Sequence, residues 1–209
     1  MDSFRGFDPD STVMHGLRTF LALVALNVLF VLSCLPVITL GAAGSALLEV
    51  MLRFADQERG YPATDYLRAL GRNLVRGTGV LLVLGLPLLA LLLAARFWIA
   101  LDSLISLLAS ILAMLGAVVV LAALIHALAL VAAFRAGVGR TVRNAVLLVG
   151  AEPLRSAGLV LIPVTGVSLV LAMPVLGWLA VTIGCAVGAY LMALLLRPVH
   201  ARYRSDADS

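Results

Sequence analysis

Three polar side chains lie inside long apolar runs of this 209-residue sequence, where a group that ionises or hydrogen-bonds is costly and therefore a candidate for function. They are Asn27, Glu49 and His126. An imidazole can exchange protons near neutral pH, and a carboxylate can hold a cation or a proton, so these groups could serve a small-solute or proton pathway. Each also has a structural interpretation. Asn27 can bridge helices, Glu49 can pair with Arg53 four residues later, and His126 can be a neutral, hydrogen-bonded group.

The other reactive residue types argue against an enzyme. All fifteen basic residues are Arg, so chemistry that needs a Schiff-base or P-loop lysine is excluded. The histidines are far apart in the sequence, with no acidic or cysteine partner at metal-ligand spacing. Cys34 and Cys185 lie in apolar runs, where a thiol behaves as a small hydrophobe. We therefore expect no catalytic residue, no metal and no cofactor.

The composition predicts an integral membrane protein. The chain is 63% hydrophobic and 12% charged, with a mean hydropathy of +1.12, whereas soluble domains have about 25% charged residues. A net charge of +4 is carried by Arg in short connections rather than in a basic groove, so no nucleic-acid partner is expected. The apolar runs are rich in Leu and Ala without strand alternation, so we predict one all-α, polytopic domain over residues 1–209.

A bilayer core is spanned by roughly 20 helical residues. Four apolar runs are candidates for membrane spans: residues 20–35, 78–101, 104–134 and 159–196. The last run is divided into two spans by the proline and glycine of residues 173–177. The ambiguous segment is 41–52, which is short and follows Pro36. It either crosses back, giving six spans, or is a half-depth segment buried by protein, giving five.

Arginine positions favour six spans. The Arg residues gather in three connections, residues 53–76, 135–157 and 197–209, which the positive-inside rule places in the cytoplasm. Six crossings with a cytoplasmic N-terminus leave only Arg96 outside, and the C-terminus is cytoplasmic in either arrangement.

Two of these connections are expected to contain basic amphipathic helices. In residues 62–76 the apolar face is predicted to be Tyr66, Leu67, Leu70 and Leu74, and the second helix is predicted over 141–148. Such helices either anchor the chain at anionic lipids or form a docking surface for a partner. The candidate contact residues are Arg68, Arg72, Arg76, Arg140 and Arg143. Gly184 and Gly188 form a close-packing GxxxG pair, for use within the chain or in oligomerisation.

The sequence resembles the YesL-type family of small bacterial membrane proteins, whose function is unknown. The resemblance is carried by Asn27, by residues 35–43 (LPVITLGAA) and 45–47 (SAL), and by Glu58-Arg59-Gly60-Tyr61, Asp65-Tyr66, Asn73 and Gly77-Thr78; residues 140–145 (RTVRNA) and Pro153 match more loosely. Glu49 departs from it, because an apolar or aromatic residue is expected there. The resemblance implies location in the bacterial cytoplasmic membrane and a gene placed beside sugar-uptake ABC transporters. It supplies no catalytic or binding residues.

These observations lead to three hypotheses. The first is an accessory component of carbohydrate ABC-type uptake that contacts permease subunits through its basic cytoplasmic helices. The second is a small secondary transporter or channel-like protein for a small solute, using Asn27, Glu49 and His126. The third is a purely structural membrane protein.

Overall fold

The computed structural model describes residues 12–56 and 60–207, and the side chains of 12–16, 18 and 198–207 are not part of that description. Arg5 and Arg59, which are predicted to be cytoplasmic, therefore lie outside the described residues. In chain order the elements are α1 (Thr12–Cys34), the 3₁₀ helix η1 (Val37–Thr39), α2 (Leu40–Ala55), α3 (Pro62–Ile99), α4 (Leu104–Ala133), α5 (Val138–Ala151), α6 (Pro153–Ala172), α7 (Leu176–Leu179), the π-helix η2 (Ala180–Gly184) and α8 (Cys185–Ala207). No strand occurs among the described residues, which confirms the all-α prediction.

Five of the described helical segments are long and apolar enough to cross a membrane. They are Val37–Ala55, Pro62–Ile99, Leu104–Ala133, Pro153–Ala172 and Leu176–Arg197, and a shorter apolar helix covers Thr19–Cys34. The chain is thus a polytopic helical membrane protein. Thr19–Cys34 is part of the 23-residue α1, and α2 has 16 residues, in agreement with the prediction of a short second helix.

The predicted breaks fall where proline and glycine place them. α1 ends at Cys34, just before Leu35-Pro36, because a proline cannot donate the next helical hydrogen bond. α6 ends at Ala172, before the predicted turn at 173–177. α5 covers the predicted second amphipathic helix and stops at Ala151, so that Pro153 can begin α6.

The first amphipathic segment differs from the prediction in two ways. It does not end at Arg76 but continues into the next span, so α3 has 38 residues and is about 57 Å long. Its packed face agrees with the prediction at Tyr66, which is fully buried, and at Leu70, which is partly buried against the core. It differs at Leu67 and Leu74, which are exposed, because the rest of the packed face is made by Ala69, Asn73 and Gly77. Small residues face α2 because they let the two helices approach closely.

α2 is the central helix of the fold, and nearly all of its residues from Gly41 to Met51 are buried. Its closest neighbour is α3. A Cβ on Gly41 would lie 2.1 Å from the carbonyl oxygen of Gly77, and one on Gly77 would lie 2.7 Å from the backbone of Ala42. Beside this contact, Thr78 Oγ1 donates to the Ile38 carbonyl at 3.0 Å. The ambiguous short segment is therefore the core around which the other helices pack.

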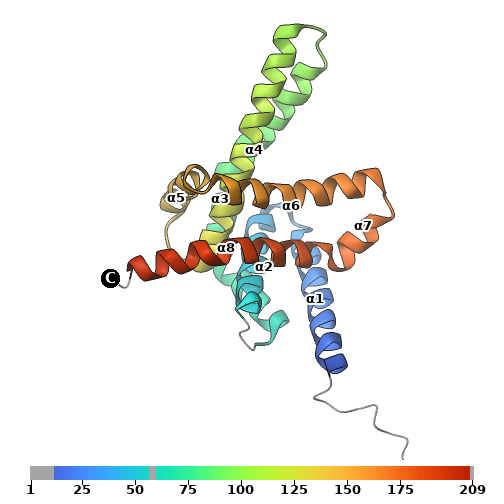
Figure 1. The fold of residues 1–209 in the computed structure, drawn as a ribbon, viewed down its shortest axis with the longest axis vertical. Coiled ribbons are helices and arrows are strands. Elements are labelled where there is room, and N and C mark those ends of the chain that lie inside the picture. Colours follow the sequence, from blue (N-terminus) through green and yellow to red (C-terminus); the bar gives the residue numbers. More distant parts are fainter. Residues whose placement is uncertain (1–11, 57–59, 208–209) are drawn as a thin grey trace, which may run out of the picture.

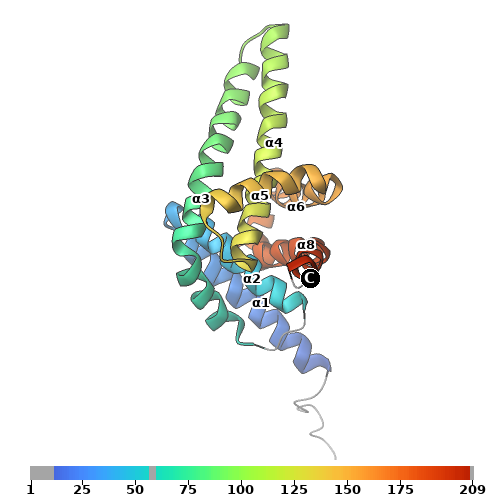
Figure 2. The ribbon, with the colours of Figure 1, turned by 90° about the vertical axis from the view of Figure 1, so that its left-hand side faces the viewer.

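Figures 1 and 2 show two parts of different character. The body consists of α1, α2, α5, α8 and the halves of α3 and α4 that pack beside them. Beyond it, the end of α3, the short connection after it and the start of α4 form a distal hairpin that projects away from the other helices in both views. A second hairpin, the end of α6 with α7, η2 and the start of α8, extends from the body in another direction (Figure 1). Most large apolar side chains of the distal hairpin are exposed, as expected for a lipid-facing surface.

Candidate functional sites

Glu49 is the centre of a buried polar cluster between α2 and α3. Its side chain is only 8% exposed. Arg53 Nη2 donates to Glu49 Oε1 at 2.9 Å, and Arg72 Nη2 donates to the same oxygen. Asn73 Nδ2 donates to the other carboxylate oxygen at 3.2 Å. The i,i+4 pair predicted from the sequence is present, and α3 adds two further partners to it.

Arg76 extends this cluster to the end of α4. Its Nη2 donates to Asn73 Oδ1 at 3.3 Å, and its Nη1 donates to the Phe134 carbonyl at 3.0 Å. Phe134 follows the last residue of α4, where backbone carbonyls lack helical partners and a cation is favourable. One connected network therefore joins α2, α3 and α4. We call Glu49, Arg53, Arg72, Asn73 and Arg76 the Glu49 cluster.

His126 lies in the body half of α4 and is 1% exposed. Its Nε2 is 2.9 Å from Ser156 Oγ of α6, itself buried. Its Nδ1 has no hydrogen-bond partner among the described residues. The buried imidazole thus links α4 to α6, and it does not line the pocket beside α5.

Asn27 of α1 is fully buried and holds the last helical segment. Its Nδ2 donates to the Ala180 carbonyl at 3.2 Å and to the Val181 carbonyl, and the Ala186 N–H donates to its Oδ1 at 2.8 Å. A π-helix shifts the backbone bonding from i−4 to i−5 and leaves groups at its ends without their usual partners. The amide satisfies these groups, which is why it is tolerated in an apolar helix.

The three candidate intramembrane residues are therefore separate sites. No hydrogen bond or ion pair described joins Asn27, Glu49 and His126, and each is engaged with different elements. Their partners on other helices, Arg72, Asn73, Ser156 and the η2 backbone, could not be found from local spacing. They come from segments distant in sequence, and the only local signal was the Glu49–Arg53 register.

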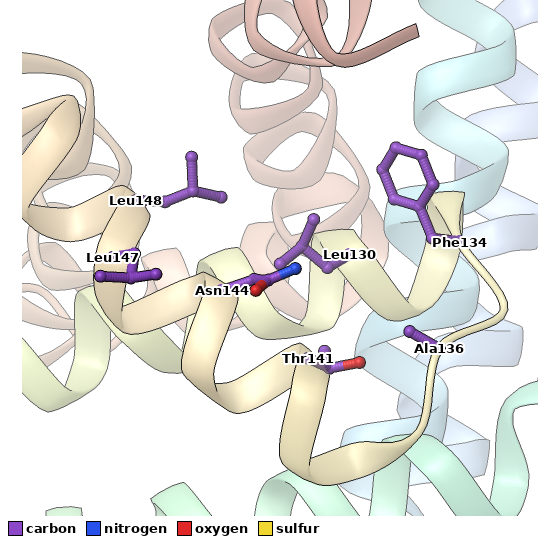
Figure 3. Close-up of a pocket in the computed structure, with 7 residues that line it drawn as sticks. All are labelled: Leu130, Phe134, Ala136, Thr141, Asn144, Leu147 and Leu148. Atoms are coloured by element: carbon purple, nitrogen blue, oxygen red, sulfur yellow. The ribbon is translucent and has the colours of Figure 1, made fainter. Parts of the chain in front are cut away.

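A pocket of about 330 Å³ lies beside α5. It is formed by the end of α4, the α4–α5 connection and α5, and Figure 3 shows its lining residues: Leu130, Phe134, Ala136, Thr141, Asn144, Leu147 and Leu148. Its lining is apolar except for Thr141, whose hydroxyl donates to the Gly137 carbonyl at 3.1 Å, and Asn144. The sequence does not reveal this pocket, because three of its seven lining residues come from the end of α4 and the connection that follows it, outside α5.

The arginines predicted as contact residues fall into two groups. Arg72 and Arg76 belong to the Glu49 cluster, although Arg72 keeps 37% of its side chain exposed. Arg68, Arg140 and Arg143 are exposed. Arg140 lies one helical turn before Asn144, and Arg143 one turn before Leu147, so both basic side chains flank the pocket.

The GxxxG pair does not act as a unit inside the chain. A Cβ on Gly188 would meet Ile162 of α6 at 3.6 Å, whereas one on Gly184 would meet only its own segment, at Leu179 and Ala180. The close glycine contact of the fold is between Gly41 and Gly77 instead. Within the described residues no group of three His, Cys, Asp or Glu side chains could hold a metal ion.

The fold and these sites define a helical membrane protein whose intramembrane polar groups link helices to one another. Residues 23–95 match the family described as "Protein of unknown function, DUF624". The matched segment runs from α1 to near the end of α3, so it contains Asn27, Gly41, Gly77 and the Glu49 cluster, whereas His126 and the α5 pocket lie outside it. No curated protein and no solved structure matches the chain.

Proposed function

We propose that this protein is an accessory component of carbohydrate ABC-type uptake in the bacterial cytoplasmic membrane, and that it contacts a permease subunit through α5. The YesL-type resemblance supports the class of transporter. The match of residues 23–95 is to a family of unknown function and supports only membership of a membrane protein family of that kind. The single structural observation that carries the proposal is the pocket beside α5 with its basic edge.

α5 presents two different sides. Thr141, Ala145 and Leu148 are buried against the body. The outward side combines Arg140 and Arg143 with exposed Val146 and Leu147. Apolar side chains beside arginine are typical of the centres of protein interfaces, and an apolar groove next to a helix suits an amphipathic helix of a partner.

The arrangement of the intramembrane polar groups favours this function over solute transport. A transport pathway needs polar groups that converge on a shared cavity near the bilayer midplane. Asn27, Glu49 and His126 instead satisfy separate helix contacts. His126 Nδ1, which has no hydrogen-bond partner among the described residues, favours the transporter hypothesis.

Co-expression with the permease subunits of a carbohydrate ABC importer from the same organism tests the proposal. We expect the tagged protein to retain those subunits through purification in mild detergent. Leu147→Asp should abolish this recovery, because it puts a charge in the pocket wall. Leu154→Asp is the matched control, since Leu154 is 87% exposed on α6 and lies outside the pocket.

A photo-crosslinker placed at Asn144 should also join the protein to a permease subunit. Purification of the protein without permease subunits, or equal recovery with L147D and L154D, would contradict docking at α5. A purely structural membrane protein would give neither the recovery nor the crosslink.

A further inference from the structure

The Glu49 cluster contains more positive charge than its carboxylate can balance. Arg53 and Arg72 both donate to one oxygen of Glu49, and Arg76 is joined to the same network through Asn73. One carboxylate therefore faces three guanidinium groups. Two of them are held close together by their shared acceptor, and like charges at such a distance repel. A second anion beside Arg53 and Arg72 would remove this imbalance.

Both arginines are accessible to such an anion. The Glu49 side chain is 8% exposed, whereas Arg53 is 46% and Arg72 is 37% exposed. A guanidinium carries five N–H donors, and the bonds to Glu49 use one nitrogen of each group. The buried carboxylate thus fixes two guanidinium groups while leaving part of each in contact with the surroundings. Paired, pre-positioned guanidinium groups are well suited to the oxygens of a phosphate.

The surface of α3 beside Arg72 indicates which kind of phosphate-containing ligand would bind there. On the helical wheel of α3, Val75, Leu82 and Leu86 continue the stripe that starts at Arg72, at spacings of three, seven and four residues. All three are exposed, and Val75 is 82% exposed. This stripe runs from the Glu49 cluster into the distal hairpin, which is the direction that acyl chains take from a headgroup into the bilayer. A ligand with a phosphate and long apolar chains fits both features.

We propose that Arg53 and Arg72, held in place by Glu49, bind the phosphate of an anionic phospholipid whose acyl chains lie along Val75, Leu82 and Leu86 of α3. Arg53 and Arg72 do not line the α5 pocket, although Arg76 of the same cluster bonds the carbonyl of Phe134, which does, and lipid binding does not depend on a permease. It also assigns Glu49 a positioning role, since this carboxylate holds the two guanidinium groups together.

Native mass spectrometry of the delipidated full chain tests the site, with phosphatidylglycerol and phosphatidylcholine as probes. We expect one phosphatidylglycerol to bind about tenfold more tightly than phosphatidylcholine, because two arginines act on its charged headgroup. Arg53→Gln with Arg72→Gln should remove this preference. Arg140→Gln with Arg143→Gln removes the same charge from α5 and should leave the preference unchanged.

Three outcomes would overturn the proposal. The first is equal binding of the two lipids by the unmodified chain. The second is equal loss in both double variants, which would mean that only overall charge matters. The third is displacement of phosphatidylglycerol by millimolar inorganic phosphate, which would show that the site recognises free phosphate rather than a lipid.

A second pair of substitutions guards against misfolding. Arg53→Lys with Arg72→Lys keeps both charges beside Glu49 but loses the planar fork that grips two oxygens, so the lipid preference should fall about fivefold. An unmodified preference in this variant would contradict the proposed geometry. The melting temperature and elution volume of each variant in detergent report whether it is folded.

Discussion

The body and the distal hairpin use similar apolar helices in opposite ways. In the body, α2 turns almost every side chain toward other helices, and Asn27, Glu49 and His126 each make a hydrogen bond to a group from a distant segment. In the distal hairpin most large apolar side chains are exposed. Ser110 Oγ of α4 donates a hydrogen bond to the Ala95 carbonyl of α3 at 3.0 Å, which joins the two helices of the hairpin. Stability is therefore expected to depend on packing and polar links in the body, and on the surrounding lipid in the hairpin.

The largest change in unfolding free energy should come from substituting a glycine at the α2–α3 contact of the body. Gly41→Ala places a methyl group 2.1 Å from the backbone oxygen of Gly77, which cannot move without separating α2 from α3. We expect a loss of about 3 kcal/mol in unfolding free energy. Reversible unfolding in mixed micelles measures it. Gly71→Ala on α3 is the control, because no atom lies within 4 Å of its added Cβ, and it should stabilise by up to about 1 kcal/mol. Equal effects at the two positions would disprove the close contact.

His126→Ala should give the next largest effect. It removes a buried ring and leaves the Ser156 hydroxyl without its partner, for a loss of about 2–3 kcal/mol. Ser110→Ala, in the distal half of the same helix, should cost about 0.6 kcal/mol. The same His126 variant tests transport: pH-dependent solute flux into proteoliposomes that disappears with this substitution would favour the transporter hypothesis over docking.

Asn27→Ala tests the link between the first and last helices. The substitution removes hydrogen bonds to the backbone of three residues around η2, and we expect a loss of about 2 kcal/mol. Thr182→Ala, an exposed position within η2 whose hydroxyl bonds only the nearby Leu179 carbonyl, should cost less than about 0.5 kcal/mol. Chemical denaturation in detergent measures both, and similar values would mean that Asn27 does not stabilise the π-helix.

The smallest effect is expected on the lipid-facing side of the hairpin. Leu112 is 69% exposed, so Leu112→Ala should change the unfolding free energy by less than about 0.5 kcal/mol. Leu26→Ala in the body removes the same atoms from a fully buried position and should cost about 3 kcal/mol. Comparable losses from the two leucines in the same micelle assay would show that the hairpin surface is covered by protein rather than by lipid.

Local signals in the sequence were sufficient for the order of the helices. Pro36, residues 173–177 and Pro153 mark helix ends because proline and glycine act on the backbone directly. The Glu49–Arg53 pair follows from a spacing of four residues within one helix. Each of these depends only on neighbouring residues.

Contacts between helices could not be read in the same way. Hydrophobicity correctly indicated Tyr66 on the packed face of α3 but also placed Leu67 and Leu74 there, and both are exposed. Ala69, Asn73 and Gly77 pack in their place, because α2 presents Gly41 and Ala42 to α3. Similarly, a helical wheel of α3 shows Arg72 only as an exposed basic residue. Its hydrogen bond to Glu49 depends on how α2 packs against α3. Burial of residues 41–52 by protein was one of two alternatives, and the sequence did not decide between them: among the five candidate spans the segment with α2 has the lowest mean hydropathy and is the most buried.

The bonds of Asn27 also set an order of events during synthesis. Its acceptors and donor lie more than 150 residues later in the chain, so they emerge from the ribosome after every other helix. Until then the amide in α1 must remain hydrated, use a temporary acceptor or be shielded by an insertase. α1 can therefore take its final place only after residues 180–186 have been made, and a chain truncated before residue 180 would expose this unsatisfied amide to membrane quality control.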